Sequence, residues 1–208
     1  MIDVKTRSDV RRLCAHVVSR ERFGRAGHIG LRWTGHGIGT DAYELRLDGL
    51  HRVADGEHRP VTTLADAAAF AGVDLAAPFS VGQDTPAVGD PAAPIALDPD
   101  ELDALLDFFR KGWGVLESVA DGALITLWPE HFDAAFVWQD RANVGASPGD
   151  ATSPEPYLYV GPWTSARPGP ENAWNAPFGA VTAASAPDAE LVAFLRDRLA
   201  LLDGGASS

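Results

Sequence analysis

Apolar residues spaced three and four positions apart predict the helices of this chain. The segments with this spacing are 7–20, 63–72, 98–119 and 185–202. In the first segment the apolar stripe consists of Val10, Leu13, Cys14, Val17 and Val18. Asp98 and Pro99 mark the start of the third helix, because a carboxylate caps free N–H groups and proline fits the first turn. We therefore expect four helices.

Apolar residues that alternate with polar or small ones predict strands. The alternation or a short apolar run occurs in segments 28–34, 43–47, 50–53, 57–61, 123–127, 132–138 and 157–160. The first two segments predict a hairpin connected by TGHGIGTD, residues 34–41. The next two continue it around a turn at Asp55 and Gly56.

The order of these elements predicts the fold class. Strands fall in two clusters, 28–61 and 123–181, with helices between them rather than after every strand. This order favours an α+β fold with a mainly antiparallel sheet, curved or a sandwich, covered by three to four helices. We expect a single domain over residues 1–208, with a long Pro/Gly-rich loop at 76–97 and a flexible tail at 203–208.

Composition and charge narrow the classes of partner. The chain has 17 Lys and Arg against 29 Asp and Glu, a net charge of −12, which disfavours nucleic acid as a partner. No apolar run reaches the roughly 18 residues that a membrane span needs, and the charged N-terminus does not resemble a signal peptide. We therefore expect a cytoplasmic protein without a membrane partner. The sequence does not predict the oligomeric state.

A lone cysteine excludes one class of site. Cys14 is the only cysteine, so neither an intrachain disulfide nor a Cys-rich zinc site can form. Its place on the apolar stripe predicts a small core residue rather than a reactive thiol.

The stretch GASPG, residues 145–149, matches the Gly-x-Ser-x-Gly pattern of a nucleophilic serine. Pro148 follows Ser147 and has no N–H to stabilise an oxyanion, and no histidine lies downstream of the serine. A triad in another chain order, His131 with Asp133 or Asp140 and then Ser147, stays formally open. The favoured interpretation is a type II turn with Pro148 and Gly149 at its centre.

Candidate catalytic residues lie in WPEHFD, residues 128–133. Glu130, His131 and Asp133 have the residue types for acid–base or metal-assisted hydrolysis. A third metal ligand would have to come from upstream, where His28, His36 and His51 lie. We favour His131 as a hydrogen-bonded structural histidine and predict no metal site; the sequence identifies no cofactor.

Aromatic residues are dense between residues 128 and 178, on segments stiffened by proline. Such side chains can form the wall of a preformed pocket, complete a core, or contact a partner protein. We predict that a small molecule binds where these segments meet the loop 35–41. The expected ligand-binding residues are Trp128, His131, Asp150, Glu155, Tyr157, Tyr159, Trp163 and Trp174. The alternatives are the hydrolase just described and a protein-interaction module.

Several separated motifs carry a resemblance. The segments WPEHFD, GASPGD, PEPYLYVGPW and WNAPFGA, with RFGRAGHIGLRWTGHGIGT near the start, resemble an uncharacterised bacterial family of conserved hypothetical proteins. The resemblance covers most of the chain and implies that these segments belong to one module, with GASPGD and PEPY adjacent. It implies no activity, substrate or catalytic residue.

Overall fold

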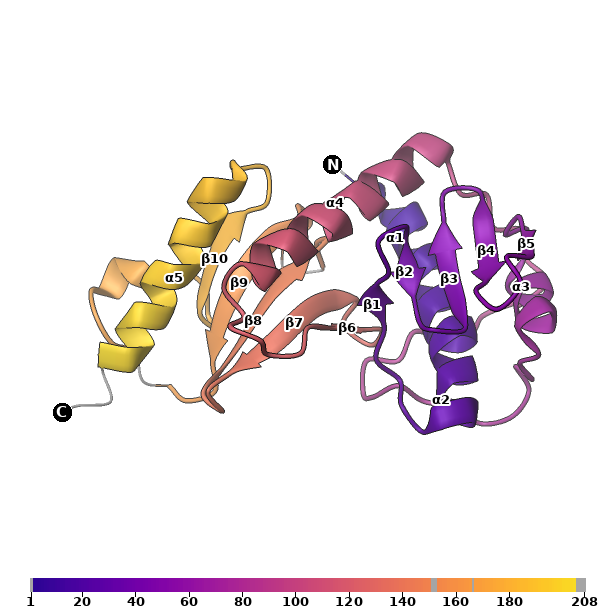
Figure 1. Cartoon of the computed structure of the whole chain (residues 1–208), viewed down its shortest axis with the longest axis horizontal. Coiled ribbons are helices and arrows are strands. Elements are labelled where there is room, and N and C mark those ends of the chain that lie inside the picture. The colour runs from indigo at the N-terminus through magenta and orange to yellow at the C-terminus, as the bar shows by residue number, and fades with distance from the viewer. Residues whose placement is uncertain (1, 151–152, 166, 205–208) are drawn as a thin grey trace. The chain divides into compact units, whose positions relative to one another are not determined.

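The computed structural model describes residues 2–150, 153–165 and 167–204 (Figure 1). The chain forms two compact units. The N-terminal unit consists of residues 2–110 and 127–132. The described part of the C-terminal unit consists of residues 111–126, 133–150, 153–165 and 167–204. Part of the predicted flexible tail, residues 205–208, lies outside the described residues. The single domain expected over 1–208 stays a prediction.

Two five-stranded antiparallel sheets and the accompanying helices confirm the predicted α+β class. The first strand cluster forms one sheet, in the order β1-β2-β3-β4-β5, and the second cluster forms the other, in the order β10-β9-β8-β7-β6. The two clusters therefore build separate sheets.

The sheet of the N-terminal unit is a meander. Its strands are β1 (Arg32–Trp33), β2 (Ile38–Gly39), β3 (Tyr43–Arg46), β4 (Gly49–Arg52) and β5 (His58–Arg59). The predicted two-stranded hairpin was wrong in one respect, because its connection at 34–41 contains β2. Glycine permits this pairing: a Cβ on Gly39 would lie 2.2 Å from the carbonyl oxygen of Tyr43. Only a residue without a side chain allows such an approach.

The first helical region is longer than the sequence predicted. It consists of α1 (Val4–Leu13), the π-helical segment η1 (Cys14–Ser19) and α2 (Arg20–Ala26). All five residues of the predicted apolar stripe are fully buried. Burial raises the pKa of the Cys14 thiol to about 12, so the thiol stays protonated and packs as a core residue.

The predicted helix at 63–72 is confirmed as α3 (Leu64–Ala71). The hydroxyl of Thr63 accepts a hydrogen bond from the N–H of Asp66, and Gly72 ends the helix with φ +68°. A side chain at Gly72 would strain that left-handed conformation. Threonine before a helix and glycine after it are typical cap residues, so the sequence indicates both ends of this helix.

Residues 76–97 form the expected long loop, which polar side chains of the first helical region hold in place. Arg12 Nη2 donates to the carbonyl of Val88 at 2.5 Å, and His16 Nε2 lies 2.6 Å from the carbonyl oxygen of Pro86. Because these bonds satisfy loop carbonyls, they order a segment without regular hydrogen bonding of its own.

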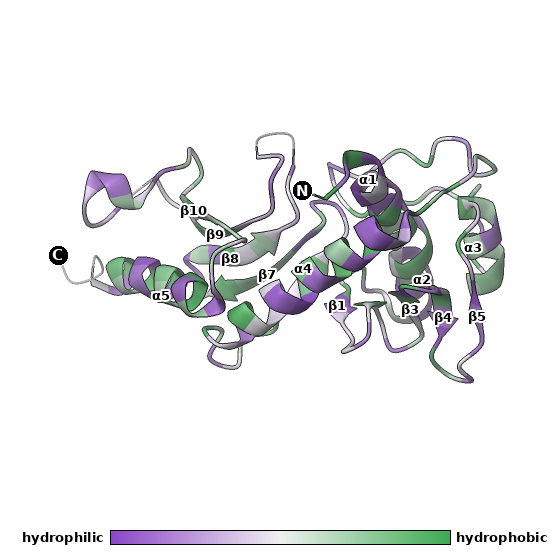
Figure 2. Ribbon diagram, turned by 90° about the horizontal axis from the view of Figure 1, so that it is seen from above, coloured by the Kyte–Doolittle hydropathy of each residue, from purple (hydrophilic) through white to green (hydrophobic). Residues whose placement is uncertain are grey.

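Helix α4 (Pro99–Glu117) supplies residues 99–110 to the N-terminal unit and 111–117 to the C-terminal unit. Hydrophobic and hydrophilic positions alternate along its turns (Figure 2). In the N-terminal unit Leu102, Leu105 and Phe109 are buried, while Asp103 and Asp107 are exposed. The helix therefore presents an acidic face next to its apolar one.

The C-terminal unit covers one face of its sheet with helices. The strands are β6 (Thr126–Trp128), of which residues 127 and 128 belong to the N-terminal unit, β7 (Asp133–Trp138), β8 (Ala142–Ser147), β9 (Tyr157–Pro162) and β10 (Ala180–Ala183). They are accompanied by η2 (Glu171–Ala173) and α5 (Asp188–Gly204). The sequence did not predict β8. A Cβ on Gly112 would lie 2.9 Å from the Cβ of Ala146, so this glycine lets α4 approach β8 closely. None of the helices that the structure describes is long and apolar enough to cross a membrane.

Candidate functional site

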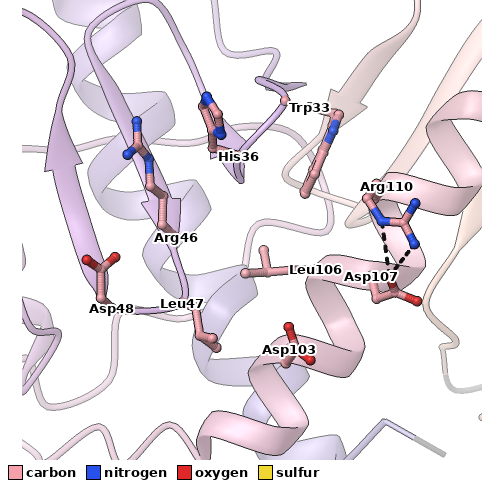
Figure 3. A pocket seen from close by; sticks show the side chains of 10 residues that line it. Trp33, His36, Arg46, Leu47, Asp48, Asp103, Leu106, Asp107 and Arg110 are labelled. Atoms are coloured by element: carbon pink, nitrogen blue, oxygen red, sulfur yellow. Dashed lines mark hydrogen bonds and ion pairs between the residues drawn. The ribbon is translucent and has the colours of Figure 1, made fainter.

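A cavity of about 700 Å³ lies in the N-terminal unit, between the turns of its sheet and residues 103–110 of α4 (Figure 3). Its volume is in the range typical of small-molecule sites. The side chains of Trp33, Leu106 and Asp103 point into the same space (Figure 3). The lining residues are Trp33, Gly35, His36, Arg46, Leu47, Asp48, Asp103, Leu106, Asp107 and Arg110.

The turn after β1 positions the aromatic part of the cavity. Trp33 is the last residue of β1, and His36 lies in the turn that leads to β2. The hydroxyl of Thr34 accepts hydrogen bonds from the N–H of Gly37 at 3.1 Å and of His36 at 3.4 Å. Gly35 supplies a φ of +94°. This hydrogen-bonded turn holds the indole and the imidazole at the cavity rim.

Helical spacing positions the opposite side. Leu106 and Asp107 lie three and four residues after Asp103, and Arg110 lies four and three residues after them. The four residues therefore share one face of α4. Leu106 is buried, and the three charged side chains are exposed. This side of the cavity therefore has an apolar floor with charges around it.

Most charges of the cavity already have partners. Arg46 forms an ion pair with the buried carboxylate of Glu44, and Arg110 Nη2 donates to Asp107 Oδ1 at 2.5 Å. Asp48 Oδ1 lies 2.6 Å from His51 Nε2, and this hydrogen bond lowers the pKa of Asp48. Among the described residues, Asp103 has no hydrogen-bond or ion-pair partner for its carboxylate, which leaves an acceptor for a ligand.

Next to this cavity lies a group of side chains with metal-ligand chemistry. Asp48, His51 and His58 each offer one ligand atom, and the three atoms lie within 4.8 Å of one another. Of the three upstream histidines considered from the sequence, only His51 belongs to this group.

The predicted site residues fall in both compact units. Trp128, Glu130 and His131 belong to the N-terminal unit, whereas Asp133 and the other predicted residues belong to the C-terminal unit. His131 Nε2 lies 2.7 Å from Glu130 Oε1, and its Nδ1 lies 3.5 Å from Asp84 Oδ2. None of these residues lines the cavity just described. Their convergence on one ligand stays a prediction.

In the C-terminal unit the structure brings four of the predicted residues together. The hydroxyl of Tyr157 donates to Asp150 at 2.7 Å, and that of Tyr159 donates to Asp133. The two tyrosine rings lie 6.1 Å apart. Burial is the main cause that raises the pKa of both hydroxyls above the ordinary tyrosine value. Both tyrosines are therefore neutral donors to carboxylates at neutral pH.

The remaining predicted residues make local contacts. Trp163 Nε1 donates to Asn143 Oδ1 at 3.0 Å, and Trp174 Nε1 donates to the carbonyl of Pro168 at 2.8 Å. The side chain of Glu155 is exposed. These three side chains do not line the cavity of the N-terminal unit.

Ser147 lies at the end of β8 and is only 3% exposed. Its Oγ accepts a hydrogen bond from the N–H of Gly149, whose φ of +102° suits the third position of a type II turn. The geometry supports the favoured turn interpretation and leaves the buried hydroxyl in a structural role.

The lining residues of the cavity carry no sequence motif. Trp33 and His36 lie at one turn of the sheet and Asp48 at another, and Asp103 comes from a helix about 60 residues further along the chain. In the sequence, only the position of Asp103 and Asp107 beside an apolar stripe could have indicated this cavity. The same pattern is equally typical of an ordinary solvated helix face.

No protein-family model, curated protein or solved structure matches this chain. The resemblance to an uncharacterised bacterial family therefore stays a prediction.

Proposed function

We propose that the protein binds a small molecule, and that its site is the cavity between Trp33, His36 and Asp103 in the N-terminal unit. The ligand class that fits is a planar or aromatic molecule with a positively charged amine. The single observation that carries the proposal is the carboxylate of Asp103, which points into the cavity without a partner among the described residues.

Three properties of the cavity support this ligand class. The Trp33 ring offers a flat surface for stacking and a π-face that attracts a cation. Leu47 and Leu106 provide apolar contact. Because the two arginines of the lining already form ion pairs with Glu44 and Asp107, the unpaired acceptor selects a cation over an anion.

Calorimetric titration with tryptamine tests the proposal, with indole-3-acetate as a ligand that keeps the ring but reverses the charge. We expect the full chain to bind tryptamine more tightly. Asp103→Asn should weaken tryptamine binding about 10-fold, the loss of one charge-assisted hydrogen bond. It should leave the affinity for indole-3-acetate unchanged or higher.

Asp100→Asn is the matched control, because Asp100 is exposed on the same helix and does not line the cavity. It removes the same charge and should not change tryptamine affinity. If both variants weakened tryptamine binding equally, the effect would come from the overall charge of the protein and the proposal would fail.

The hydrolase alternative keeps one supporting observation. His131 Nε2 lies 2.7 Å from Glu130 Oε1, which is hydrogen-bonding distance for an acid–base pair. Asp133, the other expected partner, accepts a hydrogen bond from Tyr159. A hydrolase would therefore use Glu130 with His131, and Glu130→Gln should abolish any hydrolysis found with model esters.

A cytoplasmic location and the absence of a nucleic-acid partner remain parts of the proposal. The net charge of −12 supports the second, because it repels a phosphate backbone. The interaction-module alternative would use exposed apolar side chains of the C-terminal unit, such as Val137, Trp163 and Phe178.

A further inference from the structure

We propose that Asp48, His51 and His58 form a binding site for a divalent transition-metal ion of the zinc class. The site goes beyond the proposed binding of a small molecule and does not depend on it. The two share one residue, Asp48, which lies both in this group and in the cavity lining.

The register of the sheet brings the two histidines together. His51 on β4 and His58 on β5 are directly paired across the antiparallel strands. Their rings stack at 4.8 Å between centroids and 11° between planes. Residues paired in this way hold their side chains on the same face of a sheet, so the two imidazoles lie next to each other. Because the rings are nearly parallel, the exposed His58 ring has to turn before both nitrogens can point at one ion.

The turn between β3 and β4 supplies the carboxylate. Leu47 and Asp48 connect Arg46 to Gly49, which are paired across the strands. Gly49 has a φ of +138°, and a Cβ there would lie 2.2 Å from the carbonyl oxygen of Arg59. The glycine thus lets β5 approach the turn, and this approach places Asp48 beside His58.

The distances are near those of a metal site. Asp48 Oδ1 lies 2.6 Å from His51 Nε2, and Asp48 Oδ2 lies 3.9 Å from His58 Nε2. Donors bound tetrahedrally at about 2.0–2.1 Å are separated by about 3.3 Å. Side-chain rotation, above all of His58, would therefore bring one atom of each residue to that spacing.

The donor set selects the kind of metal. Two imidazole nitrogens and one carboxylate oxygen suit zinc and its neighbours, whereas magnesium and calcium prefer oxygen donors alone. His51 is only 7% exposed, while Asp48 and His58 are exposed. The site therefore has a rigid inner ligand and an open side, where water or a ligand group can complete the coordination.

Competition with a chromophoric zinc chelator tests the proposal on the full chain without an affinity tag, after removal of metals with EDTA. We expect one equivalent of Zn²⁺ to bind, with no competition from Mg²⁺. His58→Ala should weaken zinc binding by about 10-fold or more, because it removes one of three protein ligands. His58 is exposed on a short strand, so this variant should keep the fold.

His131→Ala is the matched control, since His131 is also exposed and lies near two carboxylates, Glu130 and Asp84. It should bind zinc as the wild type does. Co²⁺ should give the visible absorption bands of a tetrahedral nitrogen–oxygen site in the wild type and lose them in His58→Ala.

Two results would overturn the inference. One is wild-type zinc affinity no higher than that of His58→Ala, and the other is a loss of zinc binding in His131→Ala alone. Because these measurements contain no tryptamine, their failure is distinct from a failure to bind tryptamine.

Discussion

Tyr159 and Asp133 show how a single buried pair determines the chemistry of a residue. The Tyr159 hydroxyl donates to the buried Asp133 carboxylate, and burial followed by this negative charge raises the pKa of the hydroxyl. A tyrosine in this state holds its proton and stabilises the carboxylate. The pair therefore orders the beginning of β7 against β9 and is unsuited to act as a base.

The raised pKa of Tyr159 predicts a loss of stability in alkali. In the unfolded chain the hydroxyl ionises near pH 10, whereas in the folded protein it stays protonated to higher pH. The stabilisation is complete below pH 10 and is lost as the pH rises through the folded pKa. Urea unfolding at several pH values between 8 and 12 should show the free energy of unfolding falling above pH 10.

Tyr159→Phe is the control for that measurement, and it should show a smaller alkaline loss. It should also destabilise the protein at pH 7 by about 1.5–3 kcal/mol, the range for a hydrogen bond to a charged group. Tyrosinate absorbance from Tyr159 near pH 10 in the folded protein would contradict the assigned role.

Some residue roles could be predicted and others could not. Pro148 argued against a nucleophile elbow at Ser147 because proline has no N–H to stabilise an oxyanion. The partner of Asp133 depends on how distant segments fold together: Tyr159 lies 26 residues from Asp133. No local pattern encodes such a contact.

At the scale of elements, strand β8 shows why periodicity missed part of the fold. Its residues are Ala142, Asn143, Val144, Gly145, Ala146 and Ser147, mostly small or polar residues of low strand propensity. Tertiary packing compensates, because the ring of Tyr159 covers Gly145: a Cβ there would lie 2.6 Å from the ring. The strand is therefore specified by its neighbours rather than by its own sequence.

This packing predicts the effect of enlarging Gly145. In Gly145→Ala the added methyl group should displace the Tyr159 ring and weaken its bond to Asp133. We expect a loss of about 1–3 kcal/mol in the free energy of unfolding, as in other overpacked sites. Thermal and urea unfolding followed by circular dichroism would measure it.

Gly114→Ala is the matched substitution. Gly114 lies in α4, and no heavy atom outside its own helix backbone and chain neighbours lies within 4 Å of a Cβ placed there. Alanine should stabilise the helix by about 0.5–1 kcal/mol. If the two substitutions changed the free energy of unfolding equally, the position of the Tyr159 ring would not depend on the absence of a side chain at Gly145.

At the scale of the whole molecule, the order of elements predicted the fold class, whereas the ligand site expected over residues 128–178 stays a prediction. Strands in two clusters separated by helices gave the α+β assignment, which the two antiparallel sheets confirm. Aromatic density directed the predicted pocket to residues 128–178, because the sequence cannot distinguish tryptophans that line a cavity from those bonded locally. The cavity described in the N-terminal unit contains Trp33 instead.

The six tryptophans offer the most direct test of where a ligand binds. The indole N–H signals of ¹⁵N-labelled tryptophan can be followed in the full chain during titration with tryptamine, with Trp33→Phe assigning the Trp33 signal. We predict that the Trp33 signal shifts saturably while those of Trp128, Trp163 and Trp174 stay in place. Shifts at any of these three with Trp33 unmoved, or no shift at all, would contradict the account.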